Sequence, residues 1–420
     1  MDDTKVRGGY MSASTQPEPW RSGRRRPLIE QCTKEWQNST RIHDTSSLDS
    51  SSDWLDILAD NAKKLWTMTK APKFQRLAVV LGIATVLAVL CWRNSLSGYL
   101  AEYRAAWNLL NGAGKSNQGQ YGQNKRVHFP GMTHVSTLDS KHLPRTSKAN
   151  PEGASKQKRL IFVGDIHGCL DELQDLLEKV NYRQGQDHII ALGDMINKGP
   201  KSSEVVDLLM KNGASAVRGN NEDRILLVAN ELASTSLTAQ VDKQEETDRV
   251  EETKAAKKNR EEREVARSFS QKQLDWLNAR PVILRIGDLG PLGEVVAVHG
   301  GLVPGIKLEN QDPVSVMNMR IVDLATHMPS EKHASEGSVP WPEFWNKYQR
   351  LRRMIAWTKK PAAKHMTVVY GHDAKRGLQI HTYTKGLDSG CVYGRKLTAW
   401  VVSDLAKEEI VQVKCREARS

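Results

Sequence analysis

Between residues 158 and 405, short apolar runs alternate with segments whose apolar residues recur at helical spacing. The run at 159–163 is typical of a buried strand, and 170–180 has the period of a helix packed on one face. Further strands are predicted at 188–192, 215–217, 294–298, 366–370 and 396–402, and a second helix at 202–212. Strand, loop and helix in repeated succession predict an α/β layered domain.

A different pattern covers residues 77–92, a run of 16 residues without charge between Arg76 and Arg93. A membrane-spanning helix needs about 20 residues, with a lower limit of about 17, and flanking Arg and Trp side chains can reach the interface. We predict a single transmembrane segment here. The alternatives are a buried core helix, which the hydrophilic flanks disfavour, and a cleaved signal peptide, which the distance from Met1 disfavours.

Positive charge is distributed unevenly around this segment. The nearby basic residues are Lys63, Lys64, Lys70, Lys73 and Arg76 before it, and Arg93 and Arg104 after it. The positive-inside rule then places the N-terminus in the cytosol and the rest of the chain across the membrane, a type II arrangement. Residues 1–60, rich in Ser, Thr, Arg, Asp and Pro, are predicted to form a disordered cytosolic tail.

Three further segments lack the pattern of a folded core. Residues 93–157, rich in Gly, Ser, Asn and Lys around their middle, are predicted to be a linker or stalk before the domain at 158–405. Within that domain, residues 242–267 hold nine acidic and eight basic residues without an apolar stripe, which predicts a solvated helix or a flexible insertion. Residues 406–420 are interpreted as a C-terminal tail.

Composition narrows the class of protein only a little. The chain of 420 residues has a formal net charge of +12, which suits an acidic partner such as a polyphosphate, a nucleic acid or an anionic lipid. Its five cysteines are too sparse for a disulfide scaffold and show no obvious pairing framework. They also lack C-x-x-C spacing, which excludes a zinc ribbon.

Five glycine-containing motifs each follow a predicted strand, where the ligand-binding loops of α/β sheets gather. Each glycine permits a tight turn, and each motif offers at least one oxygen or imidazole ligand. The motifs are Gly164-Asp165-Ile166-His167-Gly168, Gly193-Asp194-Met195, Gly219-Asn220-Asn221-Glu222, Val298-His299-Gly300-Gly301 and Gly371-His372.

The motifs together supply enough ligands for two divalent metals. The candidate ligands are Asp165, His167, Asp194, Asn220, His299 and His372. Two metals about 3.5–4 Å apart, bridged by a carboxylate, clamp a phosphate and activate a water for in-line attack. A lone histidine after a strand is more often a structural residue, but five ligand-bearing motifs in order favour a dinuclear centre.

The motifs closely resemble those of the calcineurin-like metallophosphoesterases, in the branch shared by phosphoprotein phosphatases and diadenosine tetraphosphatases. The resemblance covers about residues 158–404, includes a C-terminal signature at 386–399, and implies two mixed sheets flanked by helices. It implies that Asp165, His167 and Asp194 bind one metal, with Asp194 bridging. Asn220, His299 and His372 would complete the second site, and Arg218 is expected near the phosphate.

Two motifs depart from the family pattern. The family's second motif normally reads G-D-x-x-D-R-G and its third G-N-H-E, whereas this chain has Asn197, Lys198 and Asn221 at the differing positions. In the family, the missing Asp and His form the pair that protonates the leaving oxygen. Lys198 replaces a phosphate-binding Arg, and we predict Lys198, Arg218 and Asn221 as the catalytic residues. The Lys-Gly-Pro sequence at 198–200 resembles the ApaH-like subgroup.

Loss of this acid pair favours phosphoanhydride substrates. A serine or threonine alkoxide needs a proton donor to depart, whereas phosphate, with a second pKa near 6, leaves readily as an anion. The alternative is that bound water or another residue supplies the proton.

The chain layout also resembles that of membrane-anchored fungal members of the subgroup. This resemblance implies a zinc-dependent hydrolase of the vacuole membrane that cuts inorganic polyphosphate internally on the lumenal side, although His, Asn and Asp ligands suit Zn, Mn, Co or Fe. The alternatives are a dinucleoside polyphosphate or mRNA-cap pyrophosphohydrolase, a Ser/Thr protein phosphatase, and a phosphate-binding scaffold without activity. Specific nucleic-acid binding is not expected.

Four basic residues lie beside the Gly371-His372 motif and the signature at 386–399. They are either ordinary surface charges or the lining of a cleft for a long polyanion. They are Lys375, Arg376, Arg395 and Lys396.

Overall fold

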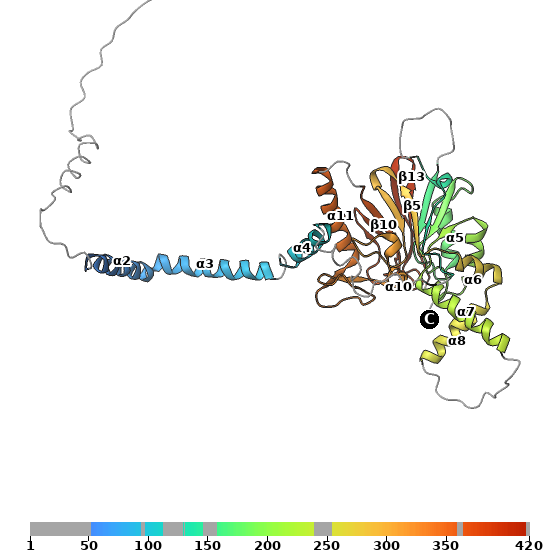
Figure 1. The fold of residues 1–420 in the computed structure, drawn as a ribbon, viewed down its shortest axis with the longest axis horizontal. Coiled ribbons are helices and arrows are strands. Elements are labelled where there is room, and N and C mark those ends of the chain that lie inside the picture. Colours follow the sequence, from blue (N-terminus) through green and yellow to red (C-terminus); the bar gives the residue numbers. More distant parts are fainter. Residues whose placement is uncertain are drawn as a thin grey trace, which may run out of the picture. The chain divides into compact units, whose positions relative to one another are not determined.

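The computed structural model describes residues 52–93, 97–111, 129, 131–145, 158–238, 254–358 and 364–416. The chain divides into two units, Met1–Leu87 and Ala88–Ser420. Helix α2 (Ser52–Lys70) precedes α3 (Pro72–Cys91), which is long and apolar enough to cross a membrane and has no buried residue (Figure 1). Residues 52–60, predicted as part of the disordered tail, therefore lie in a helix, while 1–51 lie outside the described residues.

The first large sheet of the second unit has five strands. Its strand order is β14 (Lys407–Lys414), β13 (Lys396–Ser403), β2 (Arg159–Val163), β3 (Asp187–Ala191) and β4 (Ser215–Ala216). Strands β2, β3 and β4 are parallel, with the crossover helices α5 (Leu170–Lys179) and α6 (Ser202–Lys211) between them. Strand β13 is antiparallel to both of its neighbours, β2 and β14. The apolar runs predicted as strands in this region are confirmed.

The second large sheet has six strands and is also mixed. Its strand order is β1 (Val135–Thr137), β5 (Ile283–Asp288), β6 (Glu294–Ala297), β10 (Met366–Tyr370), β12 (Thr384–Gly386) and β11 (Gln379–Ile380). A small third sheet joins β8 (Pro329–Ser330), β7 (Ile321–Asp323) and β9 (Ser338–Pro340). The remaining helices are α4 (Ser97–Asn111), α7 (Asn220–Thr238), α8 (Lys254–Arg267), α9 (Gln271–Asn278), α10 (Pro313–Asn318) and α11 (Trp341–Thr358).

Alternating side chains along the strands build three apolar layers. In β2, Leu160 and Phe162 face the second sheet, whereas Ile161 and Val163 face helices α5 and α6, as the two-residue period of a strand requires. On the outer face of the six-stranded sheet, a separate core joins the strands to α11 and α4. Figure 1 shows α5 and α6 on one side of the strands and α11 on the other. The predicted layers of two mixed sheets flanked by helices are thus confirmed.

Several predicted boundaries are wrong. Helix α4 and strand β1 lie within the expected linker at 93–157, and β14 lies within the expected tail at 406–420. Strand β1 was not predicted because it is only three residues long. Strand β14 was not predicted because most of its side chains are exposed, so it lacks the apolar run of a buried strand. In the charged insertion, α8 packs on α7, and residues 242–253 lie outside the described residues.

Candidate metal centre

The five motif loops meet at the carboxyl ends of strands from both large sheets. Four of the loops line a cavity of about 480 Å³. Parallel strands bring their carboxyl ends to one edge, where loops can present side chains to a ligand. Five of the six predicted metal ligands line this cavity, and the sixth, His299, is fully buried against Asp194. The five lining residues are Asp165, His167, Asp194, Asn220 and His372.

The donor atoms form two groups that share Asp194. Asp165, His167 and Asp194 offer ligand atoms within 4.8 Å of one another, and the same holds for Asp194, His299 and His372. Asn220 joins the second group because its Oδ1 lies 3.0 Å from His299 Nε2. A carboxylate shared between two donor groups has the place that a bridging ligand occupies.

Each histidine uses one ring nitrogen to fix its orientation. A backbone carbonyl can only accept a hydrogen bond, so the nitrogen facing it carries a proton, and the other nitrogen faces the donor cluster. The pairs are His167 Nδ1 with Ile196 at 3.3 Å, His299 Nδ1 with Leu192 at 2.8 Å, and His372 Nε2 with Asn318 at 2.9 Å. This arrangement fits metal ligation.

The motif glycines allow the loops to approach one another closely. A Cβ at Gly219 would lie 2.4 Å from Asp194 Oδ1, and one at Gly371 would lie 2.1 Å from Asp165 Oδ1. Three of the ligands also have left-handed backbones, with φ of 48° at His167 and Asp194 and 72° at His372. Such conformations cost free energy in non-glycine residues and cluster at functional sites.

Glu222, whose role the sequence interpretation missed, holds the Asp194 loop in place. Its fully buried carboxylate accepts backbone N–H groups from Asp194 at 2.7 Å, Met195 at 2.8 Å, Ile196 at 3.2 Å and Gly219 at 2.8 Å. Burial and the charge of Asp194 raise the pKa of Glu222 to about 7. One carboxylate therefore fixes two ligand-bearing loops together.

Burial and charge make the donor cluster a good receptor for cations. Burial, with the neighbouring Asp388 carboxylate, raises the pKa of Asp165 well above its usual value. Burial also acts to raise the pKa of Asp194, but the charge and hydrogen bond of His299 hold it well below its usual value. For His299 the interactions with Asp194 outweigh burial and raise its pKa to about 10. Crowded buried carboxylates gain stability when a positive charge binds between them.

The residues that replace the family's acid pair contact each other. Asn197 Nδ2 donates to Asn221 Oδ1 at 2.9 Å, and the Asn221 backbone N–H donates to Asp194 Oδ1 at 2.9 Å. The Asn221 side-chain amide also donates to the second Asp194 oxygen. Lys198 lines the cavity, with its Nζ 2.9 Å from His167 Nε2. Both Lys198 and Asn221 thus lie at the donor cluster.

Arg218 does not line the cavity, and its side chain bonds to residues away from the donor cluster. Its guanidinium is buried and donates to the Asn278 carbonyl at 2.7 Å and the Asn278 Oδ1 at 2.8 Å. It also pairs with Asp223 at 3.3 Å. These contacts join the start of α7 to α9, a structural role that depends on a partner 60 residues away along the chain.

Other residues line the cavity without having been predicted. Asp388 and Tyr393 come from the C-terminal signature segment, so their position could have been inferred from it. Arg320 had no local signal, since it follows α10 and reaches the cavity from a separate loop. Its Nη1 donates to the Glu331 carbonyl at 2.9 Å, which holds the guanidinium at the cavity wall.

Two of the four basic residues beside the C-terminal motifs line the cavity, and two do not. Lys375 and Arg395 are lining residues. Arg376 instead forms an ion pair with Asp373, and Lys396 is exposed, with its Nζ 3.2 Å from Gln412 Oε1. Of the two alternatives for these residues, Lys375 and Arg395 fit the lining of a cleft, whereas Arg376 and Lys396 do not line the cavity.

The family model described as calcineurin-like phosphoesterase matches residues 158–395, more than half of the chain. The chain belongs to the calcineurin-like phosphoesterase family. A zinc-dependent endopolyphosphatase of Saccharomyces cerevisiae is 30% identical over 281 residues, covering 61% of this chain and 81% of that protein.

Two further similar proteins are named as tetraphosphatases. A symmetrical bis(5'-nucleosyl)-tetraphosphatase of Neisseria meningitidis is 26% identical over 293 residues, covering 60% of this chain and 94% of that protein. A crystal structure described provisionally as a diadenosine tetraphosphatase is 30% identical, with a TM-score of 0.47, and covers 67% of this chain and 98% of that one. As a calcineurin-like phosphoesterase with buried candidate ligand groups, the chain is a metal-dependent phosphohydrolase.

Replacing Glu222 with Gln is expected to weaken metal binding by about 10- to 100-fold, the usual effect of losing a residue that orients metal ligands. The amide group of Gln can accept at only one of the two carboxylate positions, so backbone N–H groups now bound by Glu222 lose their acceptor. Zinc titration of the metal-free chain measures the change. Glu204→Gln, at an exposed position on α6, is the matched control. Equal affinity in both variants would contradict this role.

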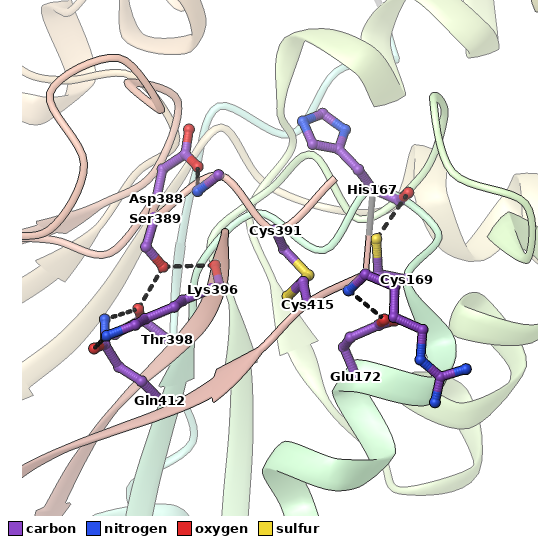
Figure 2. Close-up of a disulfide and its surroundings, with 12 residues drawn as sticks. His167, Cys169, Glu172, Asp388, Ser389, Cys391, Lys396, Thr398, Gln412 and Cys415 are labelled. Carbon is purple, nitrogen blue, oxygen red and sulfur yellow. Dashed lines mark hydrogen bonds between the residues drawn. A yellow bond between two sulfur atoms is a disulfide. The ribbon is translucent and has the colours of Figure 1, made fainter. Parts of the chain in front are cut away.

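The calcineurin-like domain also contains a disulfide that the sequence interpretation missed. Cys391 and Cys415 are bonded, with Cα atoms 5.2 Å apart (Figure 2). The bond ties the segment supplying Asp388, Tyr393 and Arg395 to the residue after β14. The two cysteines are 24 residues apart and belong to no recognised spacing motif, so the sequence alone did not pair them. They are close in space because β13 pairs with β14 in the sheet.

Proposed function

We propose that the cavity holds two divalent cations. Asp165, His167 and Asp194 would bind the first, and Asp194, Asn220, His299 and His372 the second. The shared Asp194 and the carbonyl-anchored imidazoles support this arrangement. Such cations would neutralise charge on a phosphoryl group and activate a water for in-line attack. Zinc is the proposed metal, since oxygen and imidazole donors suit it and one relative is named zinc-dependent.

The reaction we propose is hydrolysis of phosphoanhydride bonds, and the observation that carries it is the contact between Asn197 and Asn221. Two amides joined by a hydrogen bond have no ionisable proton to give to a leaving oxygen. A phosphate leaving group does not need that proton, because it departs as an anion. An alkoxide from phosphoserine does need it. The names of two relatives, an endopolyphosphatase and a dinucleoside tetraphosphatase, agree with anhydride chemistry.

The proposed substrate is inorganic polyphosphate, cut at internal bonds. Lys198 replaces the family's Arg and would act as a point charge beside the scissile phosphate. Arg320, Lys375 and Arg395 lie on the wall of the same cavity, where they would attract the neighbouring phosphates of a chain. A cavity with cations on several sides suits a polyanion that continues in both directions.

We expect long polyphosphate to shorten through intermediate lengths early in the reaction, with little free orthophosphate. The reason is that internal bonds outnumber terminal ones when a chain can lie across the site. Gel electrophoresis of the products and an orthophosphate assay measure the two quantities. The rate should also fall with added salt, which screens the charged chain. Early orthophosphate from a chain that stays long would reject internal cleavage.

The second candidate is a dinucleoside polyphosphate hydrolase, and Tyr393 is the observation that favours it. This tyrosine lines the cavity, is 45% exposed, and has its ring centre 5.9 Å from Lys198 Nζ. An exposed aromatic ring beside a phosphate site can stack on a nucleobase. Metal-supplemented assays with polyphosphate, diadenosine tetraphosphate, capped RNA and a phosphoserine peptide distinguish the candidates by their kcat/KM.

We propose further that α3 spans a membrane in the type II orientation, with the catalytic domain in the lumen of the vacuole. The distribution of basic residues around α3 supports the orientation. The Cys391–Cys415 disulfide supports it independently, because disulfides persist in oxidising compartments and are rare in the cytosol.

In sealed membrane vesicles with the cytosolic face outward, the catalytic domain is expected to be protected from protease while an epitope at the N-terminus is removed. The membrane then stands between the protease and every residue after α3. Immunoblotting against both ends gives the result. Vesicles opened with detergent are the control, in which both ends should be cut. Loss of the C-terminal signal from sealed vesicles would contradict the orientation.

A further inference from the structure

Helix α4 has an apolar outer face that faces away from the catalytic domain. Its inner face is buried against α11 and the sheet through Ala105 and Ala106. On the outside, Leu100 is 40% exposed and Trp107 is 50% exposed. Arg104, which is also exposed, lies between them at helical spacing, so the three side chains share one stripe. A tryptophan and a leucine on one exposed stripe form an apolar surface that a partner would stabilise by removing it from water.

Positive charge lies next to this stripe. Arg350 on α11 is exposed, and its proximity to Tyr103 of α4 lowers the pKa of that tyrosine, after the larger effect of the hydrogen bond from Tyr99. Arg353 is exposed one turn further along α11, beside Met354, which is 61% exposed. Among the described residues, no carboxylate forms an ion pair with Arg104, Arg350 or Arg353. The surface therefore combines apolar side chains with unneutralised arginines.

The chain itself limits how far this surface can lie from the end of α3. Only residues 92–96 separate Cys91 from Ser97, and six Cα–Cα steps span at most about 20 Å. The connection is shorter still, because Ser97 Oγ donates to the Arg93 carbonyl at 3.1 Å. If α3 crosses a bilayer, α4 begins in or next to the headgroup region, which adds several ångströms to each side of the apolar core.

We propose that this surface, formed by Leu100, Arg104 and Trp107 of α4 with Arg350 and Arg353 of α11, rests on the lipid interface of the membrane that α3 spans. The proposal rests on the proposed topology of α3. Trp side chains favour the headgroup level, and arginines reach from apolar surface to lipid phosphates. A helix of this kind lies in the interface plane. The catalytic domain is then held at the membrane surface in one orientation, since α4 packs directly on α11.

The test uses the full chain reconstituted in phosphatidylcholine vesicles containing phosphatidylserine. A fluorescent non-natural residue replaces Trp107 in one sample and Leu227 in another. Leu227 is a matched control because it is apolar, 64% exposed and lies on α7. With spin-labelled lipids that quench near the headgroups, the probe at position 107 is expected to lose most of its emission, and the probe at 227 to keep it. No loss at position 107, or equal loss at both positions, would overturn the proposal.

A second arm examines the arginines. The double variant Arg350→Glu/Arg353→Glu is expected to reduce the quenching at position 107 several-fold, because acidic side chains repel the lipid phosphates. Unchanged quenching would overturn the arginine contacts.

Two further measurements separate this proposal from the ones it depends on. Extraction with alkaline carbonate reports whether α3 spans, and hydrolysis reports the state of the metal centre. A chain that resists extraction and remains active, but shows no quenching at position 107, overturns the interfacial surface alone. A chain released by carbonate overturns the topology, and this proposal with it.

Discussion

Replacing Asp194 with Asn is expected to reduce hydrolysis by about a thousand-fold or more, equivalent to at least about 4 kcal/mol of transition-state stabilisation. Asp194 is the one side chain shared by both donor groups. Its two oxygens also accept hydrogen bonds from the backbone and side chain of Asn221. Asn keeps one oxygen and loses the negative charge, so it can neither bridge two cations nor balance their charge.

The measurement compares turnover of polyphosphate with bound metal, determined by elemental analysis of the purified chain. Asp175→Asn, at an exposed position on α5, is the control for the same chemical change outside the site. His299→Ala provides a second variant if Asp194→Asn fails to fold, since His299 belongs to the same group. Near-normal turnover with metals still bound in either variant would overturn the assignment of these ligands.

The candidate ligands could be predicted from the sequence because each lies in a loop that directly follows an apolar strand. In β2 and β3 the runs are buried on both faces, so they are apolar at almost every position and easily recognised. Parallel neighbours then bring the loops to one edge of the sheet. Asp165 and Asp194 meet for this reason, although they lie far apart in the sequence.

Elements and residues whose environment depends on tertiary contacts could not be predicted in this way. Glu222 has its role because three backbone N–H groups of the Asp194 loop and one of its own loop converge on it. Arg218 resembles a phosphate ligand in its motif, but Asn278 draws its guanidinium toward α9. Strand β1 has three residues, too few to show a period, and is defined by its pairing with β5. The Cys391–Cys415 disulfide depends in the same way on the pairing of β13 with β14.

Restoring the family's acid pair with the double variant Asn197→Asp/Asn221→His is expected to raise hydrolysis of a phosphoserine peptide by about 100-fold, the lower end of the usual contribution of general acid catalysis. The two positions are already in hydrogen-bonding contact at 2.9 Å. Asp also preserves the acceptor for the Lys198 backbone N–H, and tolerates the left-handed backbone at position 197, where φ is 70°. An imidazole held by this carboxylate can donate a proton to a departing alkoxide.

The informative quantity is the ratio of kcat on the phosphoserine peptide to kcat on polyphosphate, measured on the same preparation. Polyphosphate hydrolysis should gain nothing from the new donor, because its leaving group departs as an anion. The single variant Asn221→His is the control, since an imidazole without its carboxylate partner is poorly oriented. A ratio that stays constant while both activities persist would mean that the proton comes from elsewhere in the cavity. The contact between Asn197 and Asn221 would then no longer be a reason to prefer anhydrides over phosphoproteins as substrates.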